Sequence, residues 1–349
     1  MAQILALPNN LKEQTIVTVA NAMKNGKEIP ENYIHRGFAA VGLGVSLPLL
    51  EIPVIDISLL PSSPHELEKL RSALLSYGCF QAINHGFTEA FLNKIRHVAR
   101  QFFALPEKQN YSKVGFARYK SSDDSENRAL PWAEKLYLML STKDEEMLKR
   151  WPQNPKPFQE ILDEYSMKLQ EMNEVLFKAM ARALDLEENI FWRLLGEEPE
   201  LFARLNFYPP CPRPDLALGS KPHTDGSVIT IVLQENEVEA LQVFRDNQWF
   251  RASVLPQVLL ISIGDQAEIM SNGVLKSLLH RVVTNTERER VSMAVFCIPS
   301  LEQEIGPVKE LVSETRPASY KKVKNYVDMF FQRYDLERTT IEAAKININ

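Results

Sequence analysis

The sequence predicts an α+β fold in which helices surround an antiparallel β core, arranged as a barrel or a double-sheet jelly roll. Three observations lead to this prediction. From about residue 201 to 300, short runs of β-branched and apolar residues follow one another without a helical pattern between them. Before that stretch, apolar residues recur every three or four positions. The 349 residues, 45% hydrophobic and 24% charged, are enough to bury a full core.

The first half of the chain shows short strands next to helices. LEIPVIDIS, residues 50–58, and CFQAINHG, residues 79–86, have the composition of strands. Two amphipathic helices are predicted near 61–78 and 88–106; the first has Ser and Pro start signals and ends at Gly78, and a proline stops the second. Residues 107–135 are polar and predict an irregular loop.

A long helical segment precedes the β-rich half. From Phe158 to about Leu195, an apolar stripe at helical spacing predicts a surface that faces the core rather than a cofactor site. The predicted core strands that follow are FARLNFY, SVITIVLQ, ALQVF, QWFRAS, VLLISIG, LLHRVVTN and RVSMAVFCIP. SYKKVKNYVDMFFQRY, near the C-terminus, predicts one more amphipathic helix on the outside.

These patterns divide the chain into five segments. We expect a helical arm and linker over 1–49, an N-terminal region over 50–155 and a long helical segment over 156–200. A β core would occupy 201–300, and a C-terminal helical extension 301–349.

Composition excludes several classes of protein. A net charge of −5 gives no basic surface for nucleic acid, and no run reaches the roughly 18–20 apolar residues of a membrane helix. The N-terminal residues MAQILALPNNLKEQ lack the pattern of a secretion signal. Cys79, Cys211 and Cys297 are far apart and odd in number, which is typical of a reducing compartment. We therefore expect a cytoplasmic protein with no nucleic-acid, membrane or obligate protein partner.

A histidine and an aspartate begin the β-rich run KPHTDGSVITIVLQ. On a strand, His223 and Asp225 would point to the same face. His280 lies in the apolar strand KSLLHRVVTN, 55 positions after Asp225. Two imidazoles and one carboxylate form a facial triad that leaves three positions of an octahedral iron open, although zinc accepts the same ligands. His35, His65, His85 and His97 are predicted to be solvated, capping or turn residues instead.

A carboxylate anchor is predicted on the last core strand. Arg290 and Ser292 point to the same side of that strand, and a buried guanidinium needs an anionic partner. The distal carboxylate of a small dianion would satisfy it, whereas a protein carboxylate or an exposed edge are the alternatives. Tyr208 and Asn206 could add a hydroxyl and an amide to the same pocket.

The ordered set NFYPPCP, HTD, GDQAEIMSNG, HRVVTN and RVS resembles the plant-type iron(II)/2-oxoglutarate-dependent dioxygenases, and so do IPVIDIS, GCFQAINHG and FFALPEK. The resemblance covers about residues 50–300 and is nearest to the senescence-related and norcoclaurine-synthase-like branch. It implies a double-stranded β-helix (jelly-roll) core surrounded by helices. It makes His223, Asp225 and His280 the iron ligands, and Arg290, Ser292 and Tyr208 the contacts of the distal 2-oxoglutarate carboxylate. Asn206 would lie near the metal end of the co-substrate.

The resemblance also implies the cofactors and the reaction. They are Fe(II), with 2-oxoglutarate and O2 as co-substrates and ascorbate as a candidate stimulant. The expected reaction couples oxidative decarboxylation of 2-oxoglutarate to hydroxylation, desaturation or demethylation of a small, mainly apolar plant metabolite. Two alternatives stay open: an oxidase of the same fold that uses no 2-oxoglutarate, and a catalytically silent jelly-roll protein that binds a small ligand.

Three departures from the family's pattern lie near the site. Leu278 and Leu279 replace the common Pro-Val before His280, and Phe207 replaces a tyrosine. The loop GFARYKSSDDSENRALPW is also unusual and is expected to shape specificity. Candidate pocket walls, each equally plausible as core, are Phe116, Tyr119, Trp132, Phe296 and Phe330.

Overall fold

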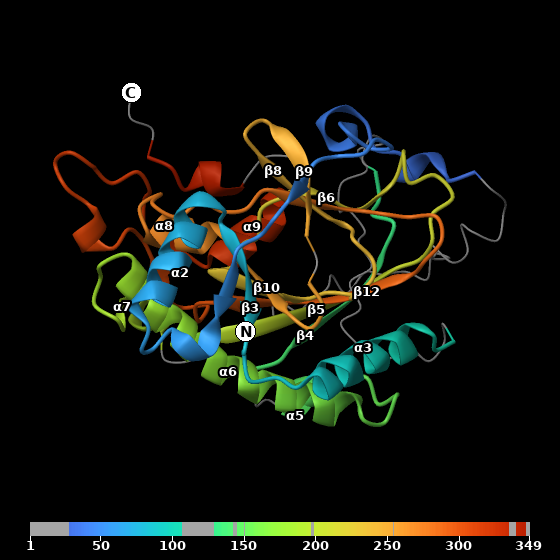
Figure 1. Cartoon of the computed structure of the whole chain (residues 1–349), viewed down its shortest axis with the longest axis horizontal. Coiled ribbons are helices and arrows are strands. Elements are labelled where there is room, and N and C mark those ends of the chain that lie inside the picture. The colour runs from blue at the N-terminus through green and yellow to red at the C-terminus, as the bar shows by residue number, and fades with distance from the viewer. Residues whose placement is uncertain are drawn as a thin grey trace.

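The computed structural model describes residues 28–106, 129–141, 145–149, 151–196, 199–253, 255–334 and 340–346, and in these residues most strands form two facing sheets (Figure 1). One sheet contains, in spatial order, β1 (Leu49–Leu50), β9 (Gln248–Ala252), β8 (Leu241–Arg245), β11 (His280–Val283) and β6 (Leu218–His223). The other contains β2 (Val54–Asp56), β3 (Cys79–Ile83), β10 (Leu259–Ile263), β7 (Ile229–Leu233), β12 (Arg290–Ile298), β5 (Glu200–Tyr208) and β4 (Glu134–Met139).

The order of the core strands makes this a double-stranded β-helix. Strand β6 lies in the smaller sheet, β7 in the larger, β8 and β9 in the smaller, β10 in the larger, β11 in the smaller and β12 in the larger. The chain therefore crosses between the sheets at almost every connection and winds around the space between them. The predicted α+β jelly roll is confirmed. A separate two-stranded ribbon pairs β13 (Glu304–Ile305) with β14 (Val323–Lys324).

Helices surround this core, and their ends follow the expected signals. Helix α2 (Pro64–Ser76) begins where Ser63 accepts a hydrogen bond from the Glu66 amide, and α3 (Glu89–Phe103) where Thr88 accepts one from Phe91. The other helices are α5 (Glu145–Leu148), α6 (Phe158–Ala183), α7 (Ile190–Leu195), α8 (Asp265–Met270) and α9 (Tyr326–Tyr334). Short 3-10 turns are η1 (Glu31–Tyr33), η2 (Gly37–Ala40), η3 (Ile57–Leu59), η4 (Lys309–Leu311) and η5 (Thr340–Ala343).

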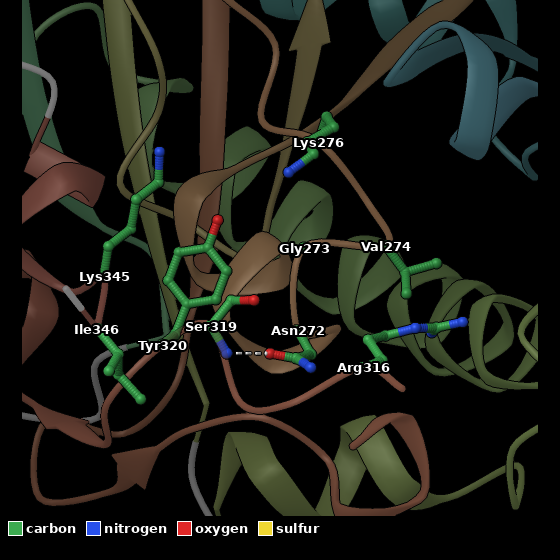
Figure 2. Close-up of a pocket in the computed structure, with 9 residues that line it drawn as sticks. All are labelled: Asn272, Gly273, Val274, Lys276, Arg316, Ser319, Tyr320, Lys345 and Ile346. Atoms are coloured by element: carbon green, nitrogen blue, oxygen red, sulfur yellow. Dashed lines mark hydrogen bonds between the residues drawn. The ribbon is translucent and has the colours of Figure 1, made fainter. Parts of the chain in front are cut away.

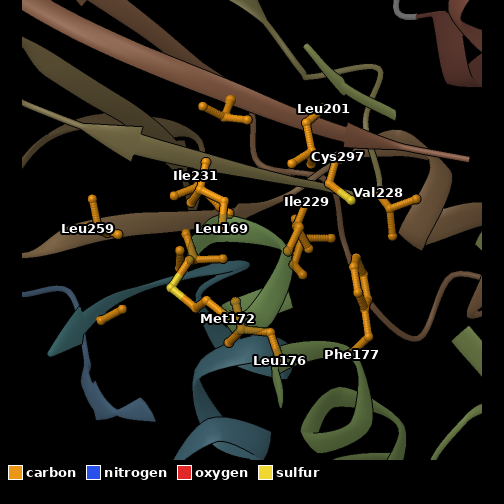
Figure 3. Packing of buried hydrophobic residues seen from close by; sticks show 14 of the residues in the cluster. Leu169, Met172, Leu176, Phe177, Leu201, Val228, Ile229, Ile231, Leu259 and Cys297 are labelled. Atoms are coloured by element: carbon orange, nitrogen blue, oxygen red, sulfur yellow. The ribbon is translucent and has the colours of Figure 1, made fainter. Parts of the chain in front are cut away.

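The main hydrophobic core lies between α6 and the larger sheet. Figure 3 shows Leu169, Met172 and Leu176 of α6 against side chains of the sheet. The strand residues that meet them belong to alternate positions, among them Leu201, Ile229, Ile231 and Cys297. The predicted apolar stripe of residues 158–180 is therefore a core surface, and the opposite face of the same strands is left to line the interior of the jelly roll.

Several predicted boundaries are wrong in detail. The expected strand over 50–58 is two strands in different sheets, and Pro53, which cannot donate a backbone hydrogen bond, lies between them. The helix expected to run to Leu195 breaks after α6, where Asp185 adopts a left-handed backbone (φ 58°). The C-terminal helix begins at Tyr326 because residues 323–324 pair as β14.

Besides the β13–β14 ribbon, two strands of the facing sheets were not predicted from the sequence. Strand β4 occupies Glu134–Met139, directly after the polar stretch expected to be irregular, and pairs with β5. Strand β6 carries His223 at its end. The five predicted segment boundaries stay predictions; strands from residues 50–155 and 201–300 share the larger sheet. The predicted N-terminal arm lies outside the described residues up to residue 27, and so do Phe116 and Tyr119. No described helix has the length and apolar character to cross a bilayer.

Candidate metal centre and its two pockets

His223, Asp225 and His280 converge at one end of the jelly roll. All three are buried, and one potential ligand atom from each lies within 4.8 Å of the others. Nε2 of His223 is 3.6 Å from Oδ1 of Asp225, and Nε2 of His280 is 3.9 Å from the same oxygen. Within the described residues this is the single group of three or more His, Cys, Asp or Glu side chains close enough to hold a metal ion.

Backbone carbonyls fix the orientation of both imidazoles. Nδ1 of His223 lies 2.7 Å from the Lys221 carbonyl oxygen, and Nδ1 of His280 lies 2.9 Å from that of Leu278. A carbonyl only accepts, so each Nδ1 carries the proton and each Nε2 offers its lone pair toward the shared centre. Burial, reinforced by the positive charge of Arg204, holds the pKa of His223 well below its ordinary value. His223 therefore stays neutral, which is the form that binds a metal.

The predicted reason for the convergence of His223 and Asp225 is wrong. The two residues do not share a strand, because β6 ends at His223 and Asp225 lies in the turn before β7. The start of α8 holds that turn: the Asp265 amide donates to the Asp225 carbonyl at 2.8 Å, and the Gln266 side chain donates to the Gly226 carbonyl at 2.7 Å. His280 instead lies directly opposite His223 in the β11–β6 pairing.

Gly226 allows helix α9 to close on this turn. A Cβ at Gly226 would lie 2.6 Å from the Phe330 ring, so the ring occupies the space that a side chain would need. Gly226 is needed for packing and not for an unusual backbone conformation, because its φ is not in the left-handed range.

The four other histidines lie away from the triad. The His85 ring bonds the Gln257 carbonyl and the Phe87 amide, as expected of a turn residue, and His65 and His97 are exposed on helices. His35 was expected in a solvated or capping position but is only 6% exposed. Its burial lowers its pKa to about 4.

Arg290, Ser292, Tyr208 and Asn206 line one polar pocket together with Asp225 and His280. Antiparallel pairing brings them together, because Arg290 lies opposite Tyr208 and Ser292 opposite Asn206. The Asn206 amide donates to the Ser292 hydroxyl at 3.2 Å, and the Arg290 guanidinium carbon lies 5.1 Å from the centre of the Tyr208 ring. The Tyr208 ring can approach because residue 219 is glycine; a Cβ there would lie 2.6 Å from it.

The Arg290 guanidinium has unused hydrogen-bonding capacity. It is 3% exposed, and Nη2 donates to the Gln234 side chain at 3.2 Å. Nε and Nη1 are buried, and neither has a hydrogen-bond partner within hydrogen-bonding geometry in the described chain. Burial lowers the pKa of Arg290, although an arginine stays charged. An anion in this pocket would therefore meet a desolvated, partly unsatisfied cation.

A second pocket, mainly apolar, lies on the other side of the triad. His223, Asp225 and Gly226 form its inner end, and its apolar wall consists of Phe202, Phe296, Ile298, Val327, Phe330 and Phe331. The candidate walls Phe296 and Phe330 are thus confirmed as pocket residues. Trp132 is core instead, because it is 1% exposed and packs on Tyr33.

Lys135 is a pocket residue that we did not predict from the sequence. It lies on β4, is 7% exposed and lines the apolar pocket together with Tyr137 and Arg204. A signal was present in KLYLML, where Leu136, Leu138 and Leu140 alternate with other residues. That alternation predicts a strand whose other face carries Lys135.

Two departures from the family pattern, Leu278 and Phe207, leave the predicted site residues in place. Leu278 lines the polar pocket, and its carbonyl accepts from His280, so this leucine serves the site through its backbone as well. Phe207 points to the opposite face of β5 and stacks on Phe103 at 5.5 Å between ring centres. The missing phenol at position 207 is therefore not part of either pocket.

A third, open pocket lies near the C-terminus and contains none of the predicted site residues. Figure 2 shows it between Asn272, Tyr320 and Lys345, with Lys276 and Arg316 at its sides. Two of its cations are already paired, Lys276 with Glu268 at 3.0 Å and Lys345 with Glu342 at 2.6 Å. These two lysines are therefore already balanced by carboxylates of the protein.

Known proteins with the same architecture agree with this geometry. Residues 199–299 match the model of the 2OG-Fe(II) oxygenase superfamily, and residues 52–156 match the non-haem dioxygenase N-terminal region described for morphine synthesis. The flavonol synthase/flavanone 3-hydroxylase of Eustoma exaltatum subsp. russellianum is 36% identical over 332 residues, covering 91% of this chain and 97% of its own. Protein SRG1 of Arabidopsis thaliana is 34% identical, covering 85% and 86%.

A solved structure extends the match to three dimensions. The crystal structure of JOX2 in complex with 2OG, Fe and JA has a TM-score of 0.81 at 29% identity and covers 95% of this chain and 98% of its own. Identity, coverage and fold lead to one conclusion: the chain belongs to the 2OG-Fe(II) oxygenase superfamily and is an Fe(II)/2-oxoglutarate-dependent dioxygenase of the plant type.

Proposed function

We propose that His223, Asp225 and His280 hold the iron(II) of this dioxygenase, and that Arg290, Ser292 and Tyr208 hold the distal carboxylate of 2-oxoglutarate. Asn206 would lie near the metal end of the co-substrate. The donor set fits iron(II), since two neutral imidazoles and one carboxylate leave other coordination positions open. The buried Arg290 guanidinium, whose Nε and Nη1 have no hydrogen-bond partner among the described residues, fits a carboxylate.

One observation supports this assignment most strongly: Asp225 lies at the boundary of both pockets. The polar pocket leads from the triad to Arg290, and the apolar pocket leads from the triad to the aromatic side chains of α9 and β12. Bound iron(II) supplies O2 activation coupled to the decarboxylation of 2-oxoglutarate to succinate and carbon dioxide. The protein would hold co-substrate and substrate on different sides of one centre, where proximity and orientation favour reaction.

The residues of the apolar pocket would orient the substrate and exclude water. Phe296, Phe330 and Phe331 present ring surfaces, so a small molecule with a substantial apolar part fits best. Which C–H group faces the metal would decide between hydroxylation, desaturation and demethylation. An oxidase that does not use 2-oxoglutarate would leave Arg290 without its carboxylate, and no observation favours that alternative or a silent binding protein.

The assignment is tested with triad variants and a matched histidine control. Wild-type protein should bind one Fe(II) anaerobically, bind 2-oxoglutarate to it with a change in optical absorption, and release succinate when supplied with a plant metabolite extract. His223→Ala and Asp225→Ala should lose the absorption change and at least about a hundredfold of the succinate rate, which corresponds to about 2.7 kcal/mol. His97→Ala, on an exposed face of α3, should behave as wild type. Full activity of Asp225→Ala would remove the triad from the mechanism.

We also propose a cytoplasmic location. Cys79, Cys211 and Cys297 are free and buried, as expected in a reducing compartment. Fluorescent fusions at either end of the chain, imaged in plant cells, test this; accumulation in the secretory pathway would contradict it.

A further inference from the structure

Lys135 is a buried lysine in the apolar pocket, and no described residue pairs with it as an anion. The residue is 7% exposed, and no hydrogen bond or ion pair joins its ammonium group to the residues that the structure describes. The charged groups that act on it are Arg204 and Lys221, both positive. Lysine is almost never buried without a partner, so its position requires an explanation.

Pairing between strands fixes the direction of Lys135. It lies opposite Asn206 in the β4–β5 register, on the face of the larger sheet that also carries Arg204, Ser292 and Phe296. Leu136 and Leu138, on the other face of β4, belong to the hydrophobic core. The lysine could not turn toward solvent without removing these leucines from the core, because side chains alternate between faces.

Arg204 adds a second positive charge to the same pocket. Its guanidinium carbon lies 5.1 Å from the centre of the Phe296 ring, and the residue lines both the apolar and the polar pocket. Among the described residues of the apolar pocket, Asp225 is the sole carboxylate, and a bound iron(II) would neutralise its charge. Burial, and then the two neighbouring positive groups, lower the pKa of Lys135 to about 7, so an anion bound beside the ammonium group would favour its charged form.

We propose that the substrate of this dioxygenase is a small organic acid whose carboxylate binds between Lys135 and Arg204 and whose apolar part lies against Phe296 and Phe330. This inference rests on the proposed function, because it takes the apolar pocket as the substrate site. A carboxylate would pair with the lysine, accept from the arginine fork and leave a C–H group near the metal. The proposal therefore narrows the substrate class from apolar metabolites in general to those that carry a carboxylate.

A second anion could explain the same charges, namely the metal end of 2-oxoglutarate. The two explanations differ in which ligand depends on Lys135. If the lysine binds the co-substrate, its replacement should lower the affinity for 2-oxoglutarate and leave the affinity for organic acids unchanged. If the lysine binds the substrate, its replacement should lower the affinity for the organic acid and leave the affinity for 2-oxoglutarate unchanged.

The test measures binding of isosteric probe pairs that differ in charge. The probes are 3-phenylpropanoate with 3-phenylpropanamide, and 2-naphthoate with 2-naphthamide, titrated anaerobically into protein loaded with Fe(II) and 2-oxoglutarate. We expect at least one acid to bind about tenfold or more tightly than its amide. Lys135→Met, which keeps most of the unbranched side chain and removes the charge, should abolish that preference and retain the affinity for 2-oxoglutarate. Lys135→Arg should restore part of it, and Lys178→Met, on the exposed side of α6, should leave it unchanged.

Several results would overturn the proposal. In the wild-type protein, they are binding of both amides as tightly as or more tightly than their acids, and failure of every probe to bind. In Lys135→Met, they are an unchanged preference for the acid, and a fall in the affinity for 2-oxoglutarate in place of the affinity for the acid. Failure of the proposed function has a different signature, because it would show as loss of Fe(II) or 2-oxoglutarate binding by the wild-type protein. Lys135→Gln provides a second neutral variant if the methionine variant does not fold.

Discussion

Each residue of β5 and β12 serves either the pockets or the core, depending on which face of the larger sheet it occupies. Arg204, Asn206 and Tyr208 point to the interior, while Ala203 and Leu205, at alternate positions of the same strand, are part of the core. A charge on the interior face costs desolvation free energy unless a ligand compensates it. Arg290 is the clearest case. It lies in a nine-residue, mainly apolar strand, where an apolar side chain would stabilise the fold better.

Replacing Arg290 with lysine therefore tests the anchor at the scale of one residue. Lysine keeps the charge and loses the planar fork that binds a carboxylate through two N–H groups. We expect the KM for 2-oxoglutarate to rise about tenfold or more, which corresponds to about 1.4 kcal/mol, with a smaller change in iron affinity. Arg288→Lys is the matched control, since Arg288 is two residues away and exposed beside Glu237. An unchanged KM for 2-oxoglutarate in Arg290→Lys would place the anchor elsewhere.

At the scale of elements, helix α9 makes two contacts, one with the turn that carries Asp225 and Gly226 and one with the start of α8. Phe330 packs on Gly226, and the Tyr326 hydroxyl donates to the Asp265 carboxylate at 2.8 Å. Asp265 is the first residue of α8, and its backbone amide donates a hydrogen bond to the Asp225 carbonyl. The C-terminal helix is thus a wall of the apolar pocket whose position depends on the same turn that presents Asp225.

Tyr326→Phe should loosen this helix without removing its ring. The lost hydroxyl leaves a buried carboxylate less satisfied, and the pKa of Asp265, raised to about 6 by burial, should rise further. We expect a loss of about 1–3 kcal/mol in the free energy of unfolding by urea, with faster hydrogen exchange over residues 326–334. Tyr77→Phe, outside both pockets, should cost much less. Unchanged exchange in α9 would show that the bond does not hold the helix.

The segment before β1 is a second element whose attachment can be tested, through pH. His35 is buried, its amide donates to the Leu216 carbonyl, and its pKa is lowered to about 4. Between pH 6.5 and 4 the unfolded chain binds a proton that the folded ring does not, so stability falls as pH decreases through this window. Protonation of His35 should lower the free energy of unfolding by about 3 kcal/mol at most over this pH range.

His35→Gln should remove that part of the pH dependence, measured as the difference between variant and wild-type urea unfolding at pH 7 and pH 4.5. The difference isolates His35 because the other titrating groups are common to both proteins. His65→Gln, exposed on α2, should leave the dependence unchanged. A His35→Gln protein with the wild-type slope would show that the ring is accessible to protons.

At the scale of the whole molecule, sequence patterns predicted the fold class and the convergence of the site residues, but not the geometry between them. His280 and Arg290 were recognisable because polar residues interrupt strongly apolar strands. The turn that carries Asp225 was not, since its shape depends on hydrogen bonds from α8, about 40 positions away. Lys135 was missed because β4 is defined by its pairing with β5, some 70 positions later in the chain. Contacts this remote leave only a weak signal in the local pattern.

The jelly roll encloses Arg290, Arg204 and Lys135 together, so the whole fold should gain stability when ligands compensate these charges. Anything that binds the folded state alone stabilises it by mass action, by about 2.7 kcal/mol at a ligand concentration of 100 Kd. For a chain of this size we expect Mn(II) with 2-oxoglutarate to raise Tm by about 2–4 °C, and a chelator to reverse the shift. Asp225→Ala should lose most of it, because the metal site and the co-substrate site would no longer be joined, while Glu237→Ala, exposed and not part of either pocket, should retain it. A full shift in Asp225→Ala would mean that 2-oxoglutarate binds through its distal carboxylate alone, and the metal would then have no part in stabilising the fold.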